Sequence, residues 1–414
     1  MRSNIIDAGK KSLVLALLLC FGLNLKAQDT LTIMAYNILN YPGSNSSKAD
    51  TLKPIIQYVR PDIFMITELT SSAGVSAIMN EALNVEGITS YQNANYVNGP
   101  DSDNMMFYNA DKLVLYSQYE IPTALRNISE YVLYYKTPGM TALTDTVFVY
   151  CYMAHLKASS GAVNVQKRNQ EVILFKNYLD SRTNIENVIF GGDFNLYTST
   201  EPAHNTILNG GSVVLLDPIS SPGDWHNNTS FAGIHTQSTR SSTIGDGGSY
   251  GGMDDRFDFI FFTEDLETGE NDLTYVQGSY DALGNDGNHF NMSINAVPTN
   301  SAVPSNIADA LYVMSDHLPI VLKATIPIDV GIQANEKLED WVGYFANNQF
   351  HFGSSQNEKK LIVLVYNVLG KTIQKTIYDN KKQFSFQMQN LKQGLYFVKV
   401  LSENKQESFK VFKK

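Results

Sequence analysis

The chain has 414 residues, of which 43% are hydrophobic and 17% charged, a composition that allows packed cores and excludes a disordered or fibrous protein. Its net charge of −10 is uneven: residues 28–334 contain 14 Lys or Arg and 33 Asp or Glu, whereas residues 335–414 contain 13 Lys and 7 Asp or Glu. The acidic body excludes a protein that holds nucleic acid through a basic surface alone, so a polyanionic substrate would need a bound cation or a local basic patch.

Residues 1–27 are expected to be a signal peptide. Basic residues precede an apolar run from Leu13 to Leu25, and cleavage is expected near Ala27. The run is shorter than the about 20 apolar residues of a membrane-spanning helix, so the mature protein is expected to have no stable membrane span. A lipoprotein cysteine at Cys20 is a weaker alternative, because Leu19 stands where a small residue is expected.

Short apolar segments alternate with turns and amphipathic stretches from residue 31 to 322, which predicts an α/β sheet protein. Helices are expected at Ala49–Val59 and Val165–Leu179. The polar stretches 217–252 and 279–305 are expected to be loops, the first either framing a substrate or forming a floppy insertion. Strands are expected at residues 31–38, 63–67, 104–108, 147–155, 187–190, 257–262 and 318–322.

The composition changes after residue 328. Residues 329–340 are expected to be a linker between a catalytic domain, residues 28–328, and a smaller domain, residues 341–414. The smaller domain contains strand-like segments and a hairpin around Asn367–Gly370, with no cluster of catalytic side chains. These features predict a small all-β sandwich.

Polar residues with metal-binding and acid–base chemistry follow or precede the predicted strands of the larger domain. Asp193 and Asn195 follow the segment Phe190-Gly191-Gly192, and residues two apart on an extended chain share a face. Mg²⁺ prefers six oxygen ligands and needs only one or two carboxylates, for which Glu68 is the best candidate. A single acid at the end of a strand usually lies in solvent, but the other polar residues expected near Glu68 favour a metal site there.

Two histidines are candidates to contact a phosphoryl group or transfer protons, because imidazole titrates near neutral pH. Asp258 is the expected carboxylate partner of His317, and Asp103 a weaker choice for His155. Lys157, two residues beyond His155, would add positive charge at the phosphate.

A serine hydrolase is a competing interpretation, because Gly247-Gly248-Ser249-Tyr250-Gly251 fits the nucleophile-elbow pattern, with Asp258 and His317 after it. That elbow requires a strand before the serine and a helix after it. Neither is expected here, since a polar loop precedes Ser249 and a strand follows it.

Five motifs follow one another in the chain between residues 30 and 326. In chain order they are Asn37, Glu68, Gly192-Asp193-Phe194-Asn195, Arg256-Phe257-Asp258 and Ser315-Asp316-His317. Together they resemble the endonuclease/exonuclease/phosphatase superfamily. The resemblance implies a four-layer α/β (α+β) sandwich, in which two packed mixed β-sheets are flanked by helices and carry the site at their shared rim.

The family resemblance also implies roles for these residues. A divalent metal would be bound by Glu68, assisted by Asn37 and Asp316, while Asp193 orients or deprotonates the attacking water. Asn195 would hold a phosphate oxygen, with Asn37 and Lys157 as further phosphate contacts. His317, supported by Asp258, would stabilise the transition state, and His155 resembles the second histidine of the deoxyribonuclease and sphingomyelinase branches.

The C-terminal domain resembles the type A sorting domain of the Bacteroidetes type IX secretion system. The resemblance rests on Leu369-Gly370-Lys371, on the segment Leu391 to Val398 and on the basic end Lys413-Lys414. It implies export across the inner and outer membranes by that machinery, to the medium or the cell surface.

Together these features predict a secreted, monomeric, Mg²⁺-dependent phosphodiesterase, with Mn²⁺ or Ca²⁺ as alternative ions and nucleic acid as the substrate of an endonuclease. Nucleic acid is preferred by family analogy, which does not fix a substrate. A phosphatase or a sphingomyelinase-like enzyme acting on small or lipid substrates is one alternative. A non-catalytic surface-binding protein on the same fold is another.

Overall fold

The computed structural model describes residues 27–43, 48–137, 146–183, 185–328, 341–346, 349–388, 391–403 and 405–413. The chain divides into two compact units, residues 1–329 and residues 330–414. The expected linker 329–340 and, apart from Ala27, the expected signal peptide lie outside the described residues. No helix in the described ranges is long and apolar enough to span a membrane.

The first unit contains a seven-stranded mixed sheet in the order β11-β13-β1-β2-β4-β3, with β12 also paired to β13. Strands β1 and β2 run parallel, and the other neighbours in this sheet are antiparallel. The bounds are Ala27–Tyr41 (β1), Ile63–Leu69 (β2), Tyr91–Asn93 (β3), Asp103–Asn109 (β4), Thr274–Tyr275 (β11), Asp281–Ala282 (β12) and Ile320–Ile328 (β13).

A second mixed sheet has six strands in the order β5-β6-β7-β8-β10-β9, and its parallel pair is β7 with β8. The two sheets pack face to face. Their close approach is seen at Gly191 of β8, where an added Cβ would lie 3.1 Å from the Ala35 Cβ of β1. The bounds are Leu113–Ile121 (β5), Ile128–Tyr135 (β6), Phe148–His155 (β7), Val188–Asp193 (β8), Leu215–Leu216 (β9) and Asp258–Thr263 (β10).

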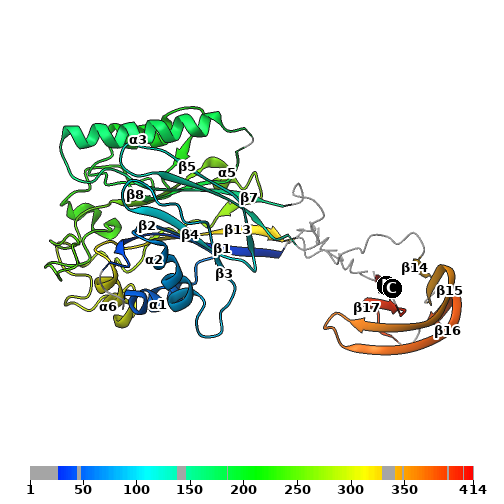
Figure 1. Cartoon of the computed structure of the whole chain (residues 1–414). Helices are drawn as coiled ribbons and strands as arrows, with labels where there is room; N and C mark the ends of the chain where they lie inside the picture. Colours follow the sequence, from blue (N-terminus) through cyan, green and yellow to red (C-terminus); the bar gives the residue numbers. More distant parts are fainter. Residues whose placement is uncertain are drawn as a thin grey trace, which may run out of the picture. The chain divides into compact units, whose positions relative to one another are not determined.

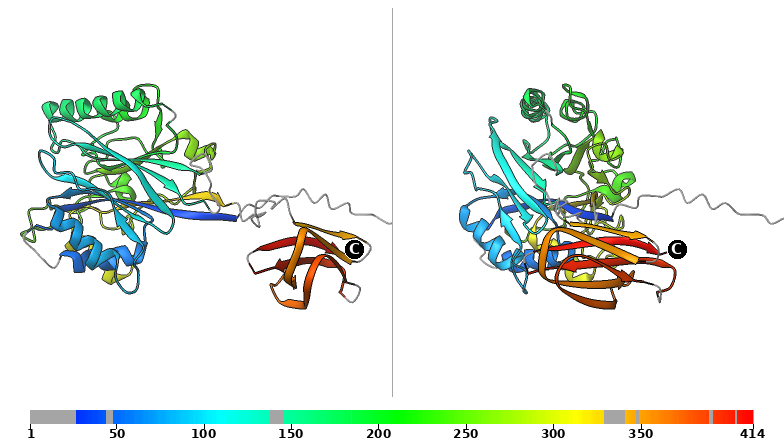
Figure 2. Two further views of the ribbon diagram at one scale, coloured as in Figure 1. Left: turned by 45° about the vertical axis from the view of Figure 1, so that its right-hand side comes forward. Right: turned by 90° about the vertical axis from the view of Figure 1, so that its right-hand side faces the viewer.

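Helices cover the outer faces of both sheets (Figure 1, Figure 2). Helix α3 lies outside the second sheet, while α1, α2 and α6 lie outside the first, which gives four layers. The predicted four-layer fold is therefore confirmed. The helix bounds are Lys48–Val59 (α1), Ser72–Ala77 (α2), Ala162–Ser181 (α3), Pro202–Asn209 (α4), Glu264–Thr268 (α5) and Ser305–Met314 (α6), with a π-helix at Ile78–Leu83 and a 3-10 helix at Thr229–Ile234.

All seven predicted strands and both predicted helices are present in the first unit, with shifted ends. The sequence analysis missed the helices α2, α4, α5 and α6 and the strands β3, β5, β6, β9, β11 and β12, the last of which lies within the expected loop 279–305. The stretch 217–252 is largely irregular, as expected, but it is not a floppy insertion throughout, since His235, Thr236 and Ser238–Arg240 are buried in the unit.

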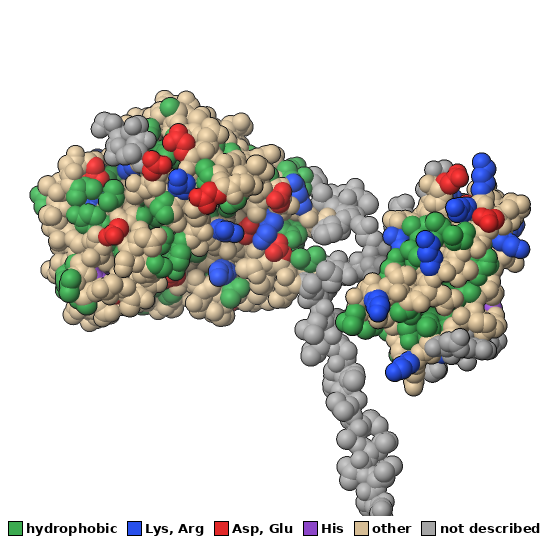
Figure 3. All heavy atoms as spheres, turned by 90° about the horizontal axis from the view of Figure 1, so that it is seen from below, with side chains coloured by type: hydrophobic (Ala, Val, Ile, Leu, Met, Phe, Trp, Pro, Cys, Tyr) green, Lys and Arg blue, Asp and Glu red, His purple; other side chains and the backbone are tan. Residues whose placement is uncertain are grey.

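The second unit is all-β, as predicted, and its five strands form one sheet in which β16 pairs with β15 beside the path β14-β15-β17-β18. A hairpin joins β15 and β16 at Asn367–Gly370, where the Gly370 N–H donates to the Asn367 carbonyl. Lys side chains predominate among the charged groups on the visible face of this unit (Figure 3). The bounds are Trp341–Ala346 (β14), Gln349–Asn367 (β15), Thr372–Gln387 (β16), Gly394–Leu401 (β17) and Gln406–Lys413 (β18).

Candidate active site

Strand register brings three of the predicted polar residues to one rim of the sheet pair. His155 of β7 stands opposite Asp193 of β8, and Asp258 of β10 stands opposite Asp193 on its other side. Asn37 and Glu68 were expected at strand ends but lie inside β1 and β2, near the carboxyl end of each strand. Glu68 has a positive φ of 61°, an uncommon backbone conformation that aims its side chain out of the strand's regular alternation.

Gly192 is required where β8 reaches the rim. Its φ is +145°, and a Cβ at this position would lie 1.9 Å from the Ala154 carbonyl oxygen of β7. A side chain would therefore force the two parallel strands apart and separate His155 from Asp193. This contact explains the second glycine of the Gly191-Gly192-Asp193 segment.

Asp193 is the centre of the site and is 2% exposed. Its Oδ2 accepts a hydrogen bond from Asn37 Nδ2 at 3.0 Å and lies 3.5 Å from both His155 Nε2 and His317 Nε2. Its Oδ1 accepts from the Asn195 N–H at 3.1 Å. Burial raises the pKa of Asp193 above its ordinary value, against the opposing charge of His317.

His317 and Asp258 form the predicted pair, with Nδ1 2.7 Å from Asp258 Oδ2. Burial opposes charge on this ring, but the surrounding carboxylates, led by Asp258 and then Asp193 and Asp316, raise the pKa of His317 well above its ordinary value. The Asp258 contact fixes a proton on Nδ1 and leaves Nε2 directed towards the Asp193 side of the site.

Gln237 also belongs to this cluster and was missed by the sequence analysis. Its Nε2 lies 3.1 Å from Asp316 Oδ2 and 2.6 Å from His317 Nε2. In this orientation the neutral His317 ring accepts a hydrogen bond from the Gln237 amide at Nε2. Protonation of His317 at Nε2 would therefore require the Gln237 side chain to rotate or to give up this hydrogen bond. The polar stretch around Gln237 has no periodicity, and only its pairing with His317 across the fold reveals its role.

His155 is buried and neutral. Desolvation lowers the pKa of His155 well below its ordinary value, and the positive charges of Arg126, His317 and Lys157 lower it further. Its buried Nδ1 lies 3.8 Å from Glu68 Oε1 and has no hydrogen-bond partner in the part of the chain that the structure describes. The suggested partner Asp103 was wrong, because that carboxylate accepts from the Tyr96 hydroxyl and the Gly99 N–H instead.

The two other predicted phosphate contacts occupy different settings. Asn195 lines the cavity next to Asp193, has a φ of +50° and donates from Nδ2 to the Leu156 carbonyl at 3.3 Å. Lys157 follows β7, but its Nζ donates to the Ala158 carbonyl and its side chain does not line the cavity. Of the two, only Asn195 faces the space where a phosphate would lie.

Glu68, Asp193 and Asp316 line one cavity of about 250 Å³. Both Glu68 oxygens accept hydrogen bonds, from Asn37 Nδ2 and the Asn40 N–H, each at 2.9 Å. Asn37 therefore joins Glu68 to Asp193, while its Oδ1 accepts from the Leu39 N–H.

The donor set at this cavity fits a divalent cation. Ligand atoms of Glu68, His155 and Asp193 lie within 4.8 Å of one another. Asp316 Oδ2 accepts from Gln237 and from the Ser249 N–H, but its buried Oδ1 has no hydrogen-bond partner among the described residues. An unpaired carboxylate oxygen beside other acids is costly unless a cation offsets it.

Ser249 contributes its backbone and not a nucleophile. Its N–H donates to Asp316 Oδ2 at 2.7 Å, and no strand or helix flanks it between residues 241 and 252. The geometry that a nucleophile elbow requires is therefore missing from this loop.

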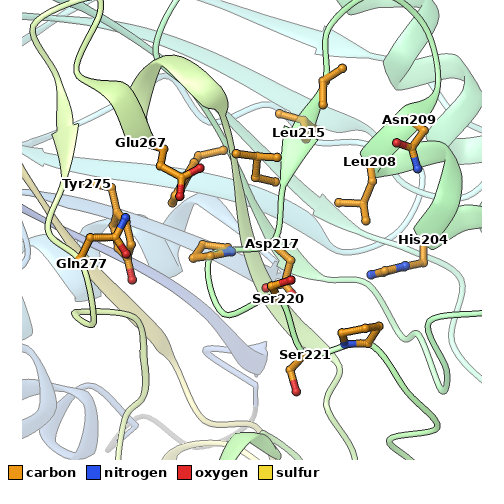
Figure 4. A pocket seen from close by; sticks show the side chains of 15 residues that line it. His204, Leu208, Asn209, Leu215, Asp217, Ser220, Ser221, Glu267, Tyr275 and Gln277 are labelled. Atoms are coloured by element: carbon orange, nitrogen blue, oxygen red, sulfur yellow. The ribbon is translucent and has the colours of Figure 1, made fainter.

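A larger cavity of about 390 Å³ lies beside β9, β10 and α4, away from these residues (Figure 4). Its lining includes Asp217, whose carboxylate is held by Arg256 at 2.8 and 2.9 Å. The Arg256 guanidinium also lies 4.1 Å from the Phe259 ring centroid. Arg256 is thus a packing residue that braces β10, and reactive groups converge at the smaller cavity instead.

Comparison with protein families gives two matches. Residues 34–317 match the model of the Endonuclease/Exonuclease/phosphatase family, and residues 346–414 match the secretion system C-terminal sorting domain. The second match indicates export through type IX secretion to the cell surface or the extracellular space. None of the curated proteins matches this chain.

Several solved structures are similar to this chain. TDP2 from D. rerio, complexed with a single-strand DNA product, is 15% identical over 72% of this chain and 99% of its own, with a TM-score of 0.47. The human Nocturnin catalytic domain with sulfate is 16% identical over 72% and 97%, with a TM-score of 0.41. Beta toxin from Staphylococcus aureus is 14% identical over 71% and 99%, with a TM-score of 0.42. The family match, which covers more than half of the sequence, shows that the chain belongs to the Endonuclease/Exonuclease/phosphatase family.

Proposed function

We propose that this exported protein is a divalent-metal-dependent phosphodiesterase, and that it acts as an endonuclease on nucleic acid. The observation that carries the proposal is the position of Asp193. This buried carboxylate lies 3.5 Å from two imidazoles and is joined through Asn37 to the more exposed Glu68. Such a set supplies a base, a charged hydrogen-bond donor and a metal ligand around one small cavity.

Asp193 is the group that orients the attacking water and takes its proton. Its pKa is raised by burial, which brings the carboxylate closer to the pKa expected of a general base at neutral pH. The bonds from Asn37 and from the Asn195 N–H fix both oxygens, so the water is oriented without a further rotation of the side chain.

His317 stabilises charge that grows on the phosphate oxygens during attack. Its raised pKa favours the imidazolium, and Asp258 holds the ring through Nδ1 so that Nε2 can donate to the phosphate. The neutral His155 offers a second hydrogen bond, and the Asn195 amide binds a phosphate oxygen. No covalent intermediate is needed in this scheme.

Glu68, assisted by Asn37 and Asp316, would hold the divalent cation, with Mg²⁺ preferred over Mn²⁺ or Ca²⁺. When bound, the cation supplies positive charge that neutralises phosphate oxygens and makes water more acidic. The acidic body of the protein makes this charge necessary, because residues 28–334 have 19 more acidic than basic side chains.

A small phosphodiester or a phosphomonoester is the second candidate substrate. The acidic body provides no general attraction for a long polyanion, and the cavity of about 250 Å³ is the size of a small headgroup. This candidate uses the same residues and the same chemistry on phosphorus.

A substrate panel with and without a chelator tests the proposal. Plasmid DNA, RNA, bis-nitrophenyl phosphate, sphingomyelin and inositol polyphosphates are incubated with the mature protein, then with excess EDTA, then with added Mg²⁺, Mn²⁺ or Ca²⁺. We expect nicking of plasmid DNA that EDTA abolishes and Mg²⁺ restores. Turnover of lipid or inositol substrates alone would favour the second candidate, and no turnover of any substrate would support a non-catalytic binding protein. Hydrolysis that ignores EDTA and is blocked by a serine-directed phosphonate would overturn the metal-dependent scheme.

A further inference from the structure

A second group of metal-ligating side chains lies outside the set around Asp193. It consists of His226, Asp254 and Asp255, whose ligand atoms all lie within 4.8 Å of one another. His226 belongs to the irregular segment after Asp224, and the two acids immediately precede the Arg256-Phe257-Asp258 segment. The proposed chemistry uses none of these three side chains.

The spacing in this group suits a cation. His226 Nδ1 lies 2.7 Å from Asp255 Oδ1, and neighbouring ligands of an octahedral ion with bonds of about 2.1 Å lie roughly 3.0 Å apart. The imidazole and the carboxylate can thus both reach one ion after a shift of a few tenths of an ångström. One nitrogen and two oxygen ligands are a set that borderline divalent ions accept.

The charge in this group is not balanced by the protein. Within the described part of the chain, no side chain donates a hydrogen bond to the half-buried Asp254 carboxylate, whereas Asp255 has only His226. One imidazole therefore faces two carboxylates.

The group is held in place on one side and open on the other. The Asp255 carbonyl accepts from the Thr236 and Gln237 N–H groups, and the Asp254 and Asp255 N–H groups donate to the Gln237 carbonyl. The His226 side chain is 51% exposed, which leaves a path for an ion and for bound water. The acids are thus preorganised by backbone bonds, while the imidazole supplies a ligand on the side that faces solvent.

We propose that His226, Asp254 and Asp255 form a second divalent-cation site, selective for Zn²⁺ or Mn²⁺ over Mg²⁺ because of its nitrogen ligand. Water fills the remaining positions. The ion would tie the segment around His226 to Asp254 and Asp255, which in turn hold the backbone of Gln237 beside His317. This site is separate from the Glu68 set, and its existence does not depend on the proposed reaction.

Equilibrium dialysis of the full mature chain against Zn²⁺ near pH 7 tests the site. Wild type, Asp254→Asn, His226→Gln, Glu68→Gln and Glu68→Gln/Asp254→Asn are compared, with Asp111→Asn as the control because that acid lies on an exposed turn. We expect Asp254→Asn and His226→Gln each to bind one equivalent of Zn²⁺ fewer than wild type. The double variant should likewise bind one fewer than Glu68→Gln.

Thermal unfolding provides a second measurement for the same variants. Zn²⁺ should raise the Tm of Glu68→Gln, and it should not raise that of Glu68→Gln/Asp254→Asn. Equal Zn²⁺ stoichiometry in wild type, Asp254→Asn and His226→Gln would overturn the site and leave an ordinary imidazole–carboxylate ion pair. If Glu68→Gln bound as much Zn²⁺ as wild type while Asp254→Asn and His226→Gln each bound one equivalent fewer, the metal role of Glu68 would be wrong. The second site would still stand.

Discussion

The rim of the first unit and the core of the C-terminal unit bury very different side chains. Asn37, Asp193, Asp258 and His317 are each at most 3% exposed at the rim. Among the described residues of the C-terminal unit, the buried cluster is apolar or aromatic, and the buried polar residues are Ser354 and Lys413. Both regions are packed, but among the described residues only the rim buries a cluster of charged groups.

This difference separates residues that serve stability from residues that serve chemistry. Burying a carboxylate or an imidazole costs free energy unless each partner is paired, and the rim places several such groups around one cavity. The C-terminal unit has no comparable cluster in its described residues and fits the role of a sorting domain. Net charge follows the same division, since the body is acidic and residues 335–414 carry a net charge of +6.

The largest expected effect is that of Gly192→Ala at the rim. The added Cβ would lie 1.9 Å from the Ala154 carbonyl oxygen, so β7 and β8 must separate, at a cost of more than about 4 kcal/mol in the free energy of unfolding. Urea unfolding, or failure to obtain soluble protein, measures this. The control Gly245→Ala also has a positive φ but no atom within 4 Å of the Cβ, and should lose only about 1–2 kcal/mol. Equal free energies of unfolding for Gly192→Ala and Gly245→Ala would contradict the close approach of β7 and β8.

Asp258→Asn should lower kcat about 100- to 10,000-fold while leaving the fold intact. The amide cannot stabilise the charged His317 ring, whose Nδ1 lies 2.7 Å from the carboxylate, so the pKa of His317 should fall. Steady-state hydrolysis and the imidazole NMR titration of His317 together check this. Loss of activity with an unchanged His317 titration would contradict the proposed pairing.

Val398→Ala probes the C-terminal unit. The side chain is fully buried in β17, so the change should cost about 1–3 kcal/mol in the stability of that unit and leave hydrolysis unchanged. The matched control Val368→Ala, at a hairpin position that is 63% exposed, should change stability by less than about 0.5 kcal/mol. A drop in kcat for Val398→Ala would mean that the core of this unit supports catalysis after all.

The smallest effect concerns the buried ion pair of His289 and Asp286, which does not line the candidate cavity. Burial opposes charge on His289, but the hydrogen bond to Asp286 raises the pKa of His289 above its ordinary value. A raised histidine pKa stabilises the fold below about pH 6.5, and this contribution is lost as the pH rises through the folded-state pKa. Wild type should therefore lose a few degrees of Tm over that window, and His289→Gln should lose less. If the Tm of wild type and that of His289→Gln changed equally with pH, the stabilising contribution of the His289–Asp286 pair would be contradicted.

Local sequence patterns predicted most of the fold but only part of the site. Apolar runs located β1, β2 and β8, whereas the edge strand β5 escaped because its half-exposed alternation with polar residues lacks a buried run. The predicted pair of His317 and Asp258 joins the segment before β13 of the first sheet to β10 of the second sheet, and it was found from the motifs. Gln237 reaches His317 from 80 residues away through an irregular segment, and no local spacing encodes such a contact.

The most direct test of the account is the turnover of bis-nitrophenyl phosphate by Asp193→Asn with saturating Mg²⁺. The exposed-turn variant Asp111→Asn serves as the matched control, and circular dichroism verifies the fold of both. Because the amide cannot accept the proton of water, we predict a loss of about 100- to 10,000-fold in kcat for Asp193→Asn and no change for the control. Turnover by Asp193→Asn within twofold of wild type would contradict a reaction centred on this carboxylate.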